Sequence, residues 1–261
     1  MLNYFRSDVV LIEWIQRGFL SNYITILTSA RDLIKKRKYN PEKLFISENM
    51  FSLYGNPKNW FEAAKVSSED RKKKFKTTKS HALSAWPSKE ELCLTEYRKY
   101  FPYNSRIEKF LKENVKIPKR TLGIHFRGTD HFHTDRIELP TYIAAAEKEL
   151  KSGNFDNIFI ATDEEGVVEK IKNFFFQKNG FNNIIVNDTL KSSGSEGLHY
   201  EKRDAENKIL LGDQVILDSH CLSACEKVIG KTSNVINYAV ILNQNLEISY
   251  LDLDSKFRNF S

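Results

Sequence analysis

The sequence is poor in cysteine. It contains three cysteines among 261 residues, Cys93, Cys221 and Cys225. An odd and sparse set of this kind excludes the disulfide framework of a small secreted domain and favours a reducing, cytosolic compartment. Cys221 and Cys225 would share one face of a helix, but two ligands do not make a zinc site, so we interpret both as small core residues.

The sequence also lacks any long apolar run. Spanning a bilayer takes about 18 consecutive apolar residues, and no such stretch occurs, so no transmembrane segment is expected. The first residues carry Arg6, Asp8 and Glu13, and no apolar segment of the secretory type follows them. We therefore expect a cytoplasmic protein.

What is present is an ordinary globular balance with an excess of positive charge. Hydrophobic residues make up 41% of the chain and charged residues 28%, and 18 Phe and 11 Tyr can fill a sizeable core. The length allows one large domain or two smaller ones that share a cleft. A formal net charge of +6 suits a nucleotide diphosphate, a nucleic acid or an anionic membrane surface, and does not choose among them.

Apolar spacing in the first half predicts the start of a parallel sheet. We expect a strand over 8–15, a helix from Ile24 that ends in the basic run 35–38, and a strand over 43–47. The strongly basic segment over 67–79 could be a loop, a helix face or an arm. A helix is expected over 88–113, with an interruption near Pro102.

After Pro118 the alternation of strands and helices begins again. The expected strands cover 121–126, 158–161, 183–186, 227–230 and 248–251, and the expected helices cover 140–150, 165–175, 214–225 and 235–242. The sequence therefore predicts two α/β halves, 1–115 and 116–261. Such halves usually bind ligands in the crevice between them, at the carboxyl ends of strands.

The first polar segment of interest directly follows the strand over 121–126, and reads His125-Phe126-Arg127-Gly128-Thr129-Asp130. Arg127 offers several fixed donors that could neutralise a diphosphate, and Gly128 permits a sharp turn. A structural ion pair between Arg127 and Asp130 is an equally good interpretation of the spacing.

Two more segments place carboxylates in unusual positions. Asp163 and Glu164 follow the strand over 158–161 and could accept hydrogen bonds from a ribose or a base. Taken by itself, however, this segment is better interpreted as Asp163 capping the next helix. Asp218 lies in an apolar helix face, where a buried carboxylate needs partners, so it could hold a loop or a ligand.

Two glycine-containing segments precede expected helices. Residues 230–234, Gly-Lys-Thr-Ser-Asn, offer backbone donors and hydroxyls that suit a phosphate. They are not a P-loop, because the required upstream glycine is Cys225 here. The segment from Gly18 to Asn22 could also admit a diphosphate, and a plain tight turn explains it equally well.

Taken in order, these segments resemble inverting GDP-fucose-dependent fucosyltransferases of the core-fucosylation and nodulation-factor type. The family's HxRRTD motif matches residues 125–130, and its ATDD-like motif matches 161–164. Its Gly-Leu-His loop matches 197–199, its ILDxHxLSxA helix matches 216–224, and a T-x-S-S segment loosely matches 230–234. The resemblance extends over residues 120–245.

The resemblance implies a GT-B-like fold, in which two Rossmann-like α/β halves face each other across a cleft. Residues 1–115 would form the acceptor side and 116–261 the donor-binding side, with GDP-fucose as donor and no metal. Arg127 would contact the donor β-phosphate, and Asp135 or the competing His131 would act as the base on the acceptor hydroxyl. The other implied donor-binding residues are Gly18, Asn22, His125, Thr129, Asp130, Asp163, Glu164, His199, Asp218 (on guanine), Thr232, Ser233 and Asn234.

Three departures from the family pattern keep alternatives open. The second arginine of the motif is Gly128, the glutamate proposed as base is Asp135, and the lysine after the motif is His131. A different donor such as GDP-mannose, a non-catalytic nucleotide- or glycan-binding role, and nucleic-acid binding through residues 71–79 remain alternatives. We expect a role in polysaccharide biosynthesis, a glycan or glycolipid acceptor and no nucleic-acid partner. Peripheral contact with an anionic membrane is left open.

Overall fold

The computed structural model describes residues 10–13, 18–67, 76–78, 87–128, 136–192, 198 and 203–252. The chain divides into two compact units. The N-terminal unit comprises Met1–Lys112 together with Asp204–Asp213, and the C-terminal unit comprises Glu113–Arg203 together with Gln214–Ser261. Each unit is an α/β structure on a parallel sheet, which confirms the expected fold class.

The N-terminal unit contains a four-stranded parallel sheet in the order β3-β2-β1-β4. Its strands are β1 (Val10–Ile12), β2 (Leu44–Ser47), β3 (Val66–Ser67) and β4 (Lys76–Thr78). The first two were expected, whereas β4 lies inside the basic segment and its composition gave no sign of a strand. Helix α1 (Phe19–Lys35) begins five residues before Ile24, directly after Gly18.

The core of this unit is rich in aromatic rings. Phe19 of α1 contacts Phe51 and Trp60, each at 4.8 Å between ring centroids. The Trp60 Nε1–H donates to Asp213 at 2.9 Å, and Arg106 of α2 (Ser105–Asn114) forms a bidentate pair with the same carboxylate at 2.6 and 2.8 Å. These bonds attach the start of helix α5 (Ala205–Ser223) to the N-terminal unit.

The helix expected over 88–113, with an interruption near Pro102, is wrong in its first part. The structure has a 3-10 helix at Thr95–Tyr100 and then α2, and residues 88–94 form turns. Ser88 and Glu91 form a reciprocal pair in this segment, in which each side chain accepts a hydrogen bond from the other's backbone N–H, at 3.2 and 2.8 Å. This reciprocal arrangement closes a turn locally. The other short 3-10 helices are Pro41–Lys43, Glu48–Phe51, Pro57–Asn59 and Ala63–Lys65.

The C-terminal unit contains a five-stranded parallel sheet in the order β7-β6-β5-β8-β9. Its strands are β5 (Thr121–Phe126), β6 (Asn157–Thr162), β7 (Ile184–Val186), β8 (Lys227–Gly230) and β9 (Glu247–Tyr250). Its helices are α3 (Leu139–Lys151), α4 (Val167–Asn179), α6 (Asn234–Leu242) and the later turns of α5. All of these elements were expected, although α5 begins nine residues earlier than predicted.

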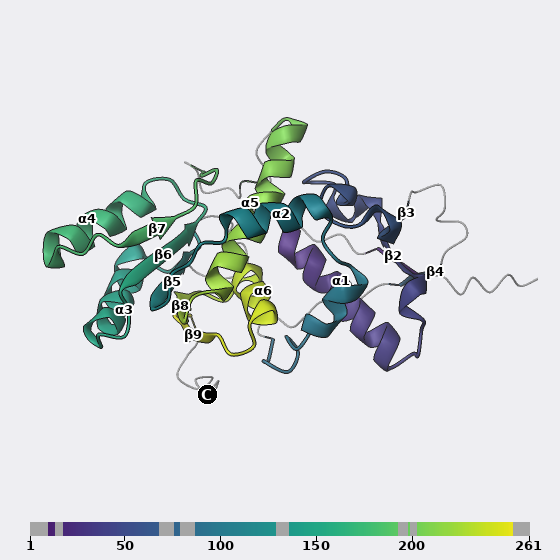
Figure 1. Ribbon diagram of the computed structural model, residues 1–261, viewed down its shortest axis with the longest axis horizontal. Coiled ribbons are helices and arrows are strands. Elements are labelled where there is room, and N and C mark those ends of the chain that lie inside the picture. Colours follow the sequence, from purple (N-terminus) through teal and green to yellow (C-terminus); the bar gives the residue numbers. More distant parts are fainter. Residues whose placement is uncertain are drawn as a thin grey trace, which may run out of the picture. The chain divides into compact units, whose positions relative to one another are not determined.

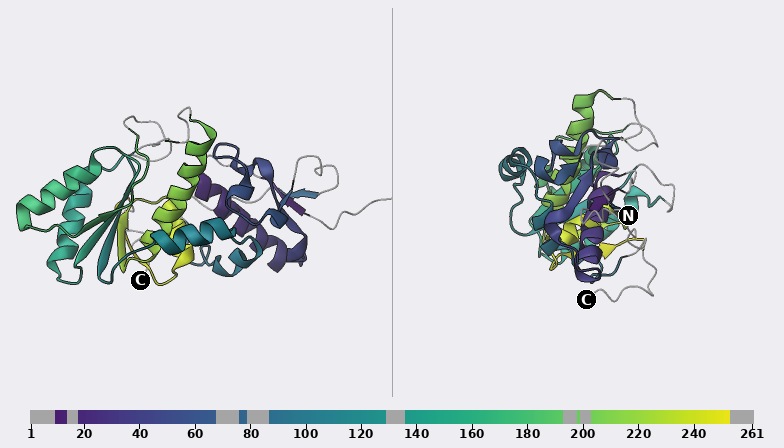
Figure 2. Two further views of the ribbon diagram at one scale, coloured as in Figure 1. Left: turned by 45° about the horizontal axis from the view of Figure 1, so that its top comes forward. Right: turned by 90° about the vertical axis from the view of Figure 1, so that its right-hand side faces the viewer.

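The two faces of β5 pack against different helices. Leu122, Ile124 and Phe126 join a buried cluster with residues of α3 and α4, among them Tyr142 and Phe175. Gly123 faces the other side of the sheet. It lies so close to α5 that a Cβ added to it would be 3.1 Å from Leu222 Cδ2. Figures 1 and 2 show α3 and α4 on one face of the sheet and α6 on the other. The sheet is therefore covered on both faces, as parallel sheets require.

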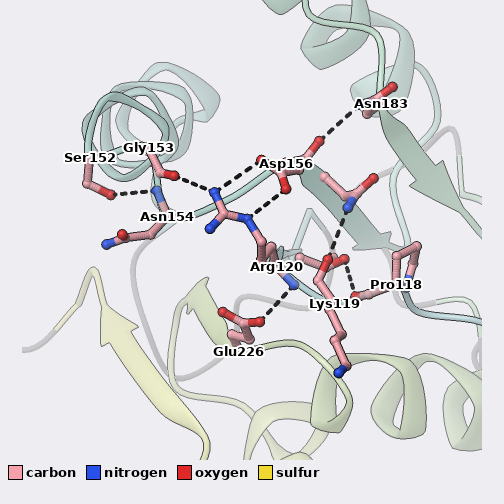
Figure 3. Close-up of polar contacts among 11 residues, drawn as sticks. Pro118, Lys119, Arg120, Ser152, Gly153, Asn154, Asp156, Asn183 and Glu226 are labelled. Carbon is pink, nitrogen blue, oxygen red and sulfur yellow. Dashed lines mark hydrogen bonds and ion pairs between the residues drawn. The ribbon is translucent and has the colours of Figure 1, made fainter.

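A polar network closes the amino-end edge of this sheet (Figure 3). Arg120 donates to Asp156 at 2.6 Å and to the carbonyl of Gly153, and its own N–H donates to Glu226 at 2.7 Å. The backbone N–H of Asp156 returns a bond to the Arg120 carbonyl at 2.8 Å. Arg120 has a φ of 57°, an uncommon backbone conformation for a non-glycine residue, and this network holds it there.

Within the described ranges, no helix is long and apolar enough to cross a bilayer.

Candidate functional site

The strand order of the C-terminal sheet creates a topological switch point between β5 and β8. The chain proceeds outward from β5 through β6 to β7, and then returns to β8 on the other side of β5. Ligands of open α/β sheets bind outside the carboxyl ends of the strands at such a point. His125 lies in register with Gly230 there, so Arg127 and residues 231–234 leave the sheet at neighbouring positions.

His125 is buried at this edge and links β5 to the start of α6. Its Nδ1 lies 3.4 Å from the Ser233 hydroxyl, which also caps α6 by accepting the N–H of Ile236 at 3.2 Å. Burial lowers the pKa of His125 to about 4; nearby Asp163 opposes this shift and Arg127 adds to it. The imidazole is therefore neutral near pH 7, and beside a diphosphate it would act through hydrogen bonds rather than charge.

Gly230 is required by close packing at the end of β8. A Cβ there would lie 2.4 Å from Ile236 Cδ1 and 3.3 Å from the His125 carbonyl oxygen. The missing side chain lets the first turn of α6 lie directly against the ends of β5 and β8. The N-terminus of a helix placed in this way is suited to an anion.

Gly128, where the family motif has an arginine, is fixed on three sides. Its N–H donates to Asp163 Oδ1 at 2.9 Å, and its carbonyl accepts from Arg136 at 3.3 Å. An added Cβ would lie 2.1 Å from Glu164 Oε2 and 2.3 Å from Glu164 Cβ. The carboxylate of Glu164 thus occupies the space of a side chain at 128, which accounts for glycine at this position.

Arg136 is a member of this cluster that the sequence gave no reason to select. It pairs with Glu164 at 3.1 Å and with Glu138 at 3.6 Å, and its guanidinium lies over the Phe126 ring. Its charge is therefore shared with two carboxylates, and its contact with the Gly128 carbonyl fixes the backbone directly after Arg127.

The alternative in which Asp163 caps the following helix is wrong. Helix α4 starts at Val167 with Gly166 at its N-cap, and no side chain accepts a bond from its first turn. Asp163 instead receives the Gly128 N–H, and its charge acts on His125 and Asp218. The ends of β5 and β6 are thereby joined by a carboxylate.

Asp218 of α5 is a partly buried carboxylate with one amide partner. Asn187, which follows β7, donates to its Oδ1 at 2.8 Å. Burial raises the pKa of Asp218 to about 6, while Asn187 and the positive charge of Lys191 partly oppose the shift. A buried carboxylate is costly unless hydrogen-bond donors surround it, so this arrangement suits a ligand that brings N–H groups.

The segment after β8 carries both expected and unexpected residues. Thr232 donates its N–H to both oxygens of Asp252 at 3.1 Å, and its hydroxyl lies 3.3 Å from the same carboxylate. Asn234 is exposed in the first turn of α6, whereas Lys231 is 1% exposed. The contact with Asp252 thus shows that the N–H and hydroxyl of Thr232 can bind an anionic group.

Two predicted donor-binding residues belong to the N-terminal unit. Gly18 is the N-cap of α1 with a φ of −88°, and an added Cβ would come no closer than 3.6 Å to Ser21 Cβ, so nothing in its surroundings requires glycine. Asn22 is buried in the first turn of α1, and its backbone N–H donates to the Gly18 carbonyl at 3.1 Å.

The remaining predicted site residues lie outside the described residues: Thr129, Asp130, His131, Asp135 and His199. The same holds for most of the basic segment over 71–79, of which the structure describes only β4. In the described part of the chain, no group of three or more His, Cys, Asp or Glu residues could hold a metal ion.

Comparison with known proteins bears on the fold. No protein-family model and no curated protein sequence matches the chain. Among solved structures, the fucosyltransferase NodZ from Bradyrhizobium is similar with a TM-score of 0.56 and 16% identity, covering 94% of this chain and 96% of that one. NodZ alpha-1,6-fucosyltransferase soaked with GDP-fucose gives a TM-score of 0.55 at 15% identity, covering 90% and 92%. POFUT1 in complex with GDP-fucose gives 0.50 at 9% identity, covering 94% and 98%. The chain therefore shares the fold of these fucosyltransferases.

Proposed function

We propose that this chain is an inverting glycosyltransferase that transfers fucose from GDP-fucose to a glycan hydroxyl. One observation carries the proposal: Arg127 and the partly buried carboxylate of Asp218 occur in the same unit, which has a switch point at its carboxyl edge. The shared fold with fucosyltransferases, one of them soaked with GDP-fucose, supports the same donor.

The carboxylate of Asp218 would favour guanine as the base of the donor. Guanine presents two adjacent N–H donors, at N1 and N2, and a carboxylate can accept both. Adenine has no such pair of donors. Since Asn187 already donates to Oδ1, the base would complete the hydrogen bonding of the carboxylate.

In the proposed reaction the acceptor hydroxyl attacks the anomeric carbon while GDP leaves, so negative charge develops on the β-phosphate. Arg127 and the donors at the start of α6 would stabilise that charge. Loss of one such donor typically raises the barrier by about 3–4 kcal/mol. Asp135 or His131 would accept the proton from the attacking hydroxyl, and His131 has a side chain whose ordinary pKa suits that role.

The proposal assigns charge neutralisation to Arg127 rather than to a metal ion. A chelator such as EDTA should then leave the transfer rate unchanged, and a rate that requires added Mg²⁺ or Mn²⁺ would contradict this part of the proposal.

We also propose a cytoplasmic role in polysaccharide biosynthesis, with a glycan or glycolipid acceptor and peripheral contact with an anionic membrane. The sparse cysteines and the net charge of +6 support this setting. We propose no nucleic-acid partner.

Release of GDP tests the function without knowledge of the acceptor. The chain should release GDP from GDP-fucose faster than from GDP-mannose, and should bind GDP more tightly than ADP or UDP in calorimetric titrations. Faster turnover of GDP-mannose would identify mannose, rather than fucose, as the donor sugar. Binding of GDP without any turnover, including in the presence of a glycan library, would indicate a non-catalytic protein.

A further inference from the structure

A second anion site is suggested by a basic pocket in the N-terminal unit. A hollow of about 320 Å³ is lined by residues at the turn between α1 and β2: Arg37, Lys38, Tyr39, Asn40 and Lys43. Three of these five carry a positive charge and none carries a negative one. The volume is at the lower end of the range of small-molecule sites, which is about 300–1,000 Å³.

Compensation of the helix dipole does not account for all of this charge. Basic side chains near a helix C-terminus are favourable, and Lys35 and Lys36 fit that explanation. Lys35 pairs with Glu96 and Lys36 with Asp32, each at 3.3 Å. Arg37 and Lys38 are exposed, and across the ranges that the structure describes neither forms an ion pair.

Lys38 occupies a backbone position where glycine would be less strained. Lys38 has a φ of 57° in the turn that ends α1, where the Tyr39 N–H donates to the Leu33 carbonyl at 3.0 Å. Glycine is the common residue at this left-handed position after a helix. Such conformations persist only where the surrounding structure holds them, and they cluster at binding sites, which agrees with a use for the Lys38 side chain.

The rest of the turn is well ordered by its own hydrogen bonds. Asn40 caps the short helix Pro41–Lys43 by accepting the Glu42 N–H at 2.9 Å. Glu42, the nearest carboxylate in sequence, lies outside the pocket lining and pairs with Lys65 at 3.5 Å. The basic side chains are therefore carried by a fixed turn, and the adjacent acid is engaged elsewhere.

We propose that this pocket binds a phosphate group on a small molecule or a lipid headgroup. A phosphate brings up to two charges and several acceptor oxygens, which suit the forked donors of Arg37 and the ammonium groups of Lys38 and Lys43. The remaining volume can receive the glycerol or sugar that carries the phosphate. The site belongs to the N-terminal unit and does not depend on the proposed donor site.

Titration of the full chain with inorganic phosphate and with glycerol 3-phosphate tests the proposal. The backbone amide NMR signals of residues 37–43 should shift in a saturable way. The double variant Arg37→Gln/Lys38→Gln should weaken binding about tenfold or more, because charge-assisted hydrogen bonds are lost. Its control, Lys148→Gln/Lys151→Gln, removes two charges from the last turn of α3 and should change the affinity little.

The variant Lys38→Gly tests phosphate binding separately from the termination of helix α1. It relieves the left-handed strain, so the thermal unfolding midpoint should stay equal or rise while phosphate binding weakens. Unchanged phosphate affinity in Lys38→Gly and in the double variant would overturn the proposal.

Sedimentation with lipid vesicles identifies the source of the phosphate. Binding to phosphatidylglycerol vesicles but not to phosphatidylcholine vesicles, lost in the double variant, supports a lipid headgroup. Binding of glycerol 3-phosphate without vesicle binding supports a soluble ligand. Failure to bind in both experiments, or equal loss in the α3 control, would refute the site.

Discussion

The two edges of the C-terminal sheet use charged residues in opposite ways. At the amino-end edge, Arg120 and Asp156 are 47% and 59% exposed and are joined by short hydrogen bonds. At the carboxyl-end edge, His125 is buried and Asp218 is partly buried, and their pKa values move to about 4 and about 6. The difference indicates that the ion pair at the first edge closes the fold, whereas the second edge keeps a neutral imidazole and an ionised carboxylate at a cost in stability.

That cost can be estimated from the shifted pKa values. A change of one pKa unit corresponds to about 1.4 kcal/mol. Ionised Asp218, with a pKa raised from 3.8 to about 6, therefore lowers stability at neutral pH by roughly 3 kcal/mol. A carboxylate kept ionised at such a cost is a candidate for contact with a ligand that compensates for it. Variants at the two edges should therefore differ in whether they change stability or ligand binding.

The largest expected effect is on turnover. Arg127→Ala should slow release of GDP from GDP-fucose by a few hundredfold, since about 3–4 kcal/mol of transition-state stabilisation is lost. Its thermal midpoint should remain close to that of the wild type. The matched change Arg120→Ala should lower the thermal midpoint and leave turnover within about twofold. A reversed pattern would remove the functional distinction between the edges.

Asp218→Asn should weaken GDP binding and stabilise the fold at the same time. The folded-state pKa of Asp218 exceeds its unfolded value, so stability is lost as pH rises through about 6. The variant should therefore gain up to roughly 3 kcal/mol in unfolding free energy at pH 7.5, and this gain should vanish below about pH 4. Chemical denaturation at both pH values measures it. In the wild type, GDP affinity should fall as pH drops below about 6, because the protonated carboxyl accepts poorly. A destabilised Asn variant would indicate a purely structural Asp218.

Gly128→Ala tests the packing at the end of β5. The new Cβ would overlap Glu164, so we expect a loss of about 1–3 kcal/mol in unfolding free energy. Glu164→Gly should restore most of that loss in the double variant, because both overlapping atoms disappear. Gly18→Ala is the stability control, since space for a Cβ exists there. Equal stability of the two alanine variants would contradict the described contact.

The smallest expected effect, taken as a change per pH unit, concerns the acid limb of stability. The folded-state pKa of His125 lies below its unfolded value, so its contribution is present above about pH 6.5 and is lost as pH falls toward 4. Asp218 acts in the opposite direction over almost the same interval, and the wild type should be nearly flat there. In Asp218→Asn the stability should fall by about 1.4 kcal/mol per pH unit between pH 6 and 4. A flat profile in that variant would show that His125 is not desolvated.

Much of this sheet could be predicted because its strands are short apolar runs bounded by polar residues. The expected ranges of β5 and β8 agree with the structure to the residue, and Arg127 and residues 231–234 follow them directly. The start of α5 was missed because Gly212 interrupts its apolar pattern. An added Cβ there would lie 2.5 Å from the Trp60 ring, and no local pattern reports a contact between positions 60 and 212.

The partners of the site residues were not predictable for a related reason. Asn187, Arg136 and Asp252 carry no motif, and only the folded sheet brings them to Asp218, Gly128 and Thr232. The strand β4 was missed because Lys76–Thr78 is polar, and its pairing with β1 is set by the sheet rather than by its own composition.

A crystal structure of the chain with GDP tests the central claim most directly. The account predicts that the guanine N1–H and N2–H groups donate to Asp218 and that the diphosphate contacts Arg127 at the end of β5. A nucleotide bound away from this edge, or one whose diphosphate contacts neither Arg127 nor the start of α6, would contradict it.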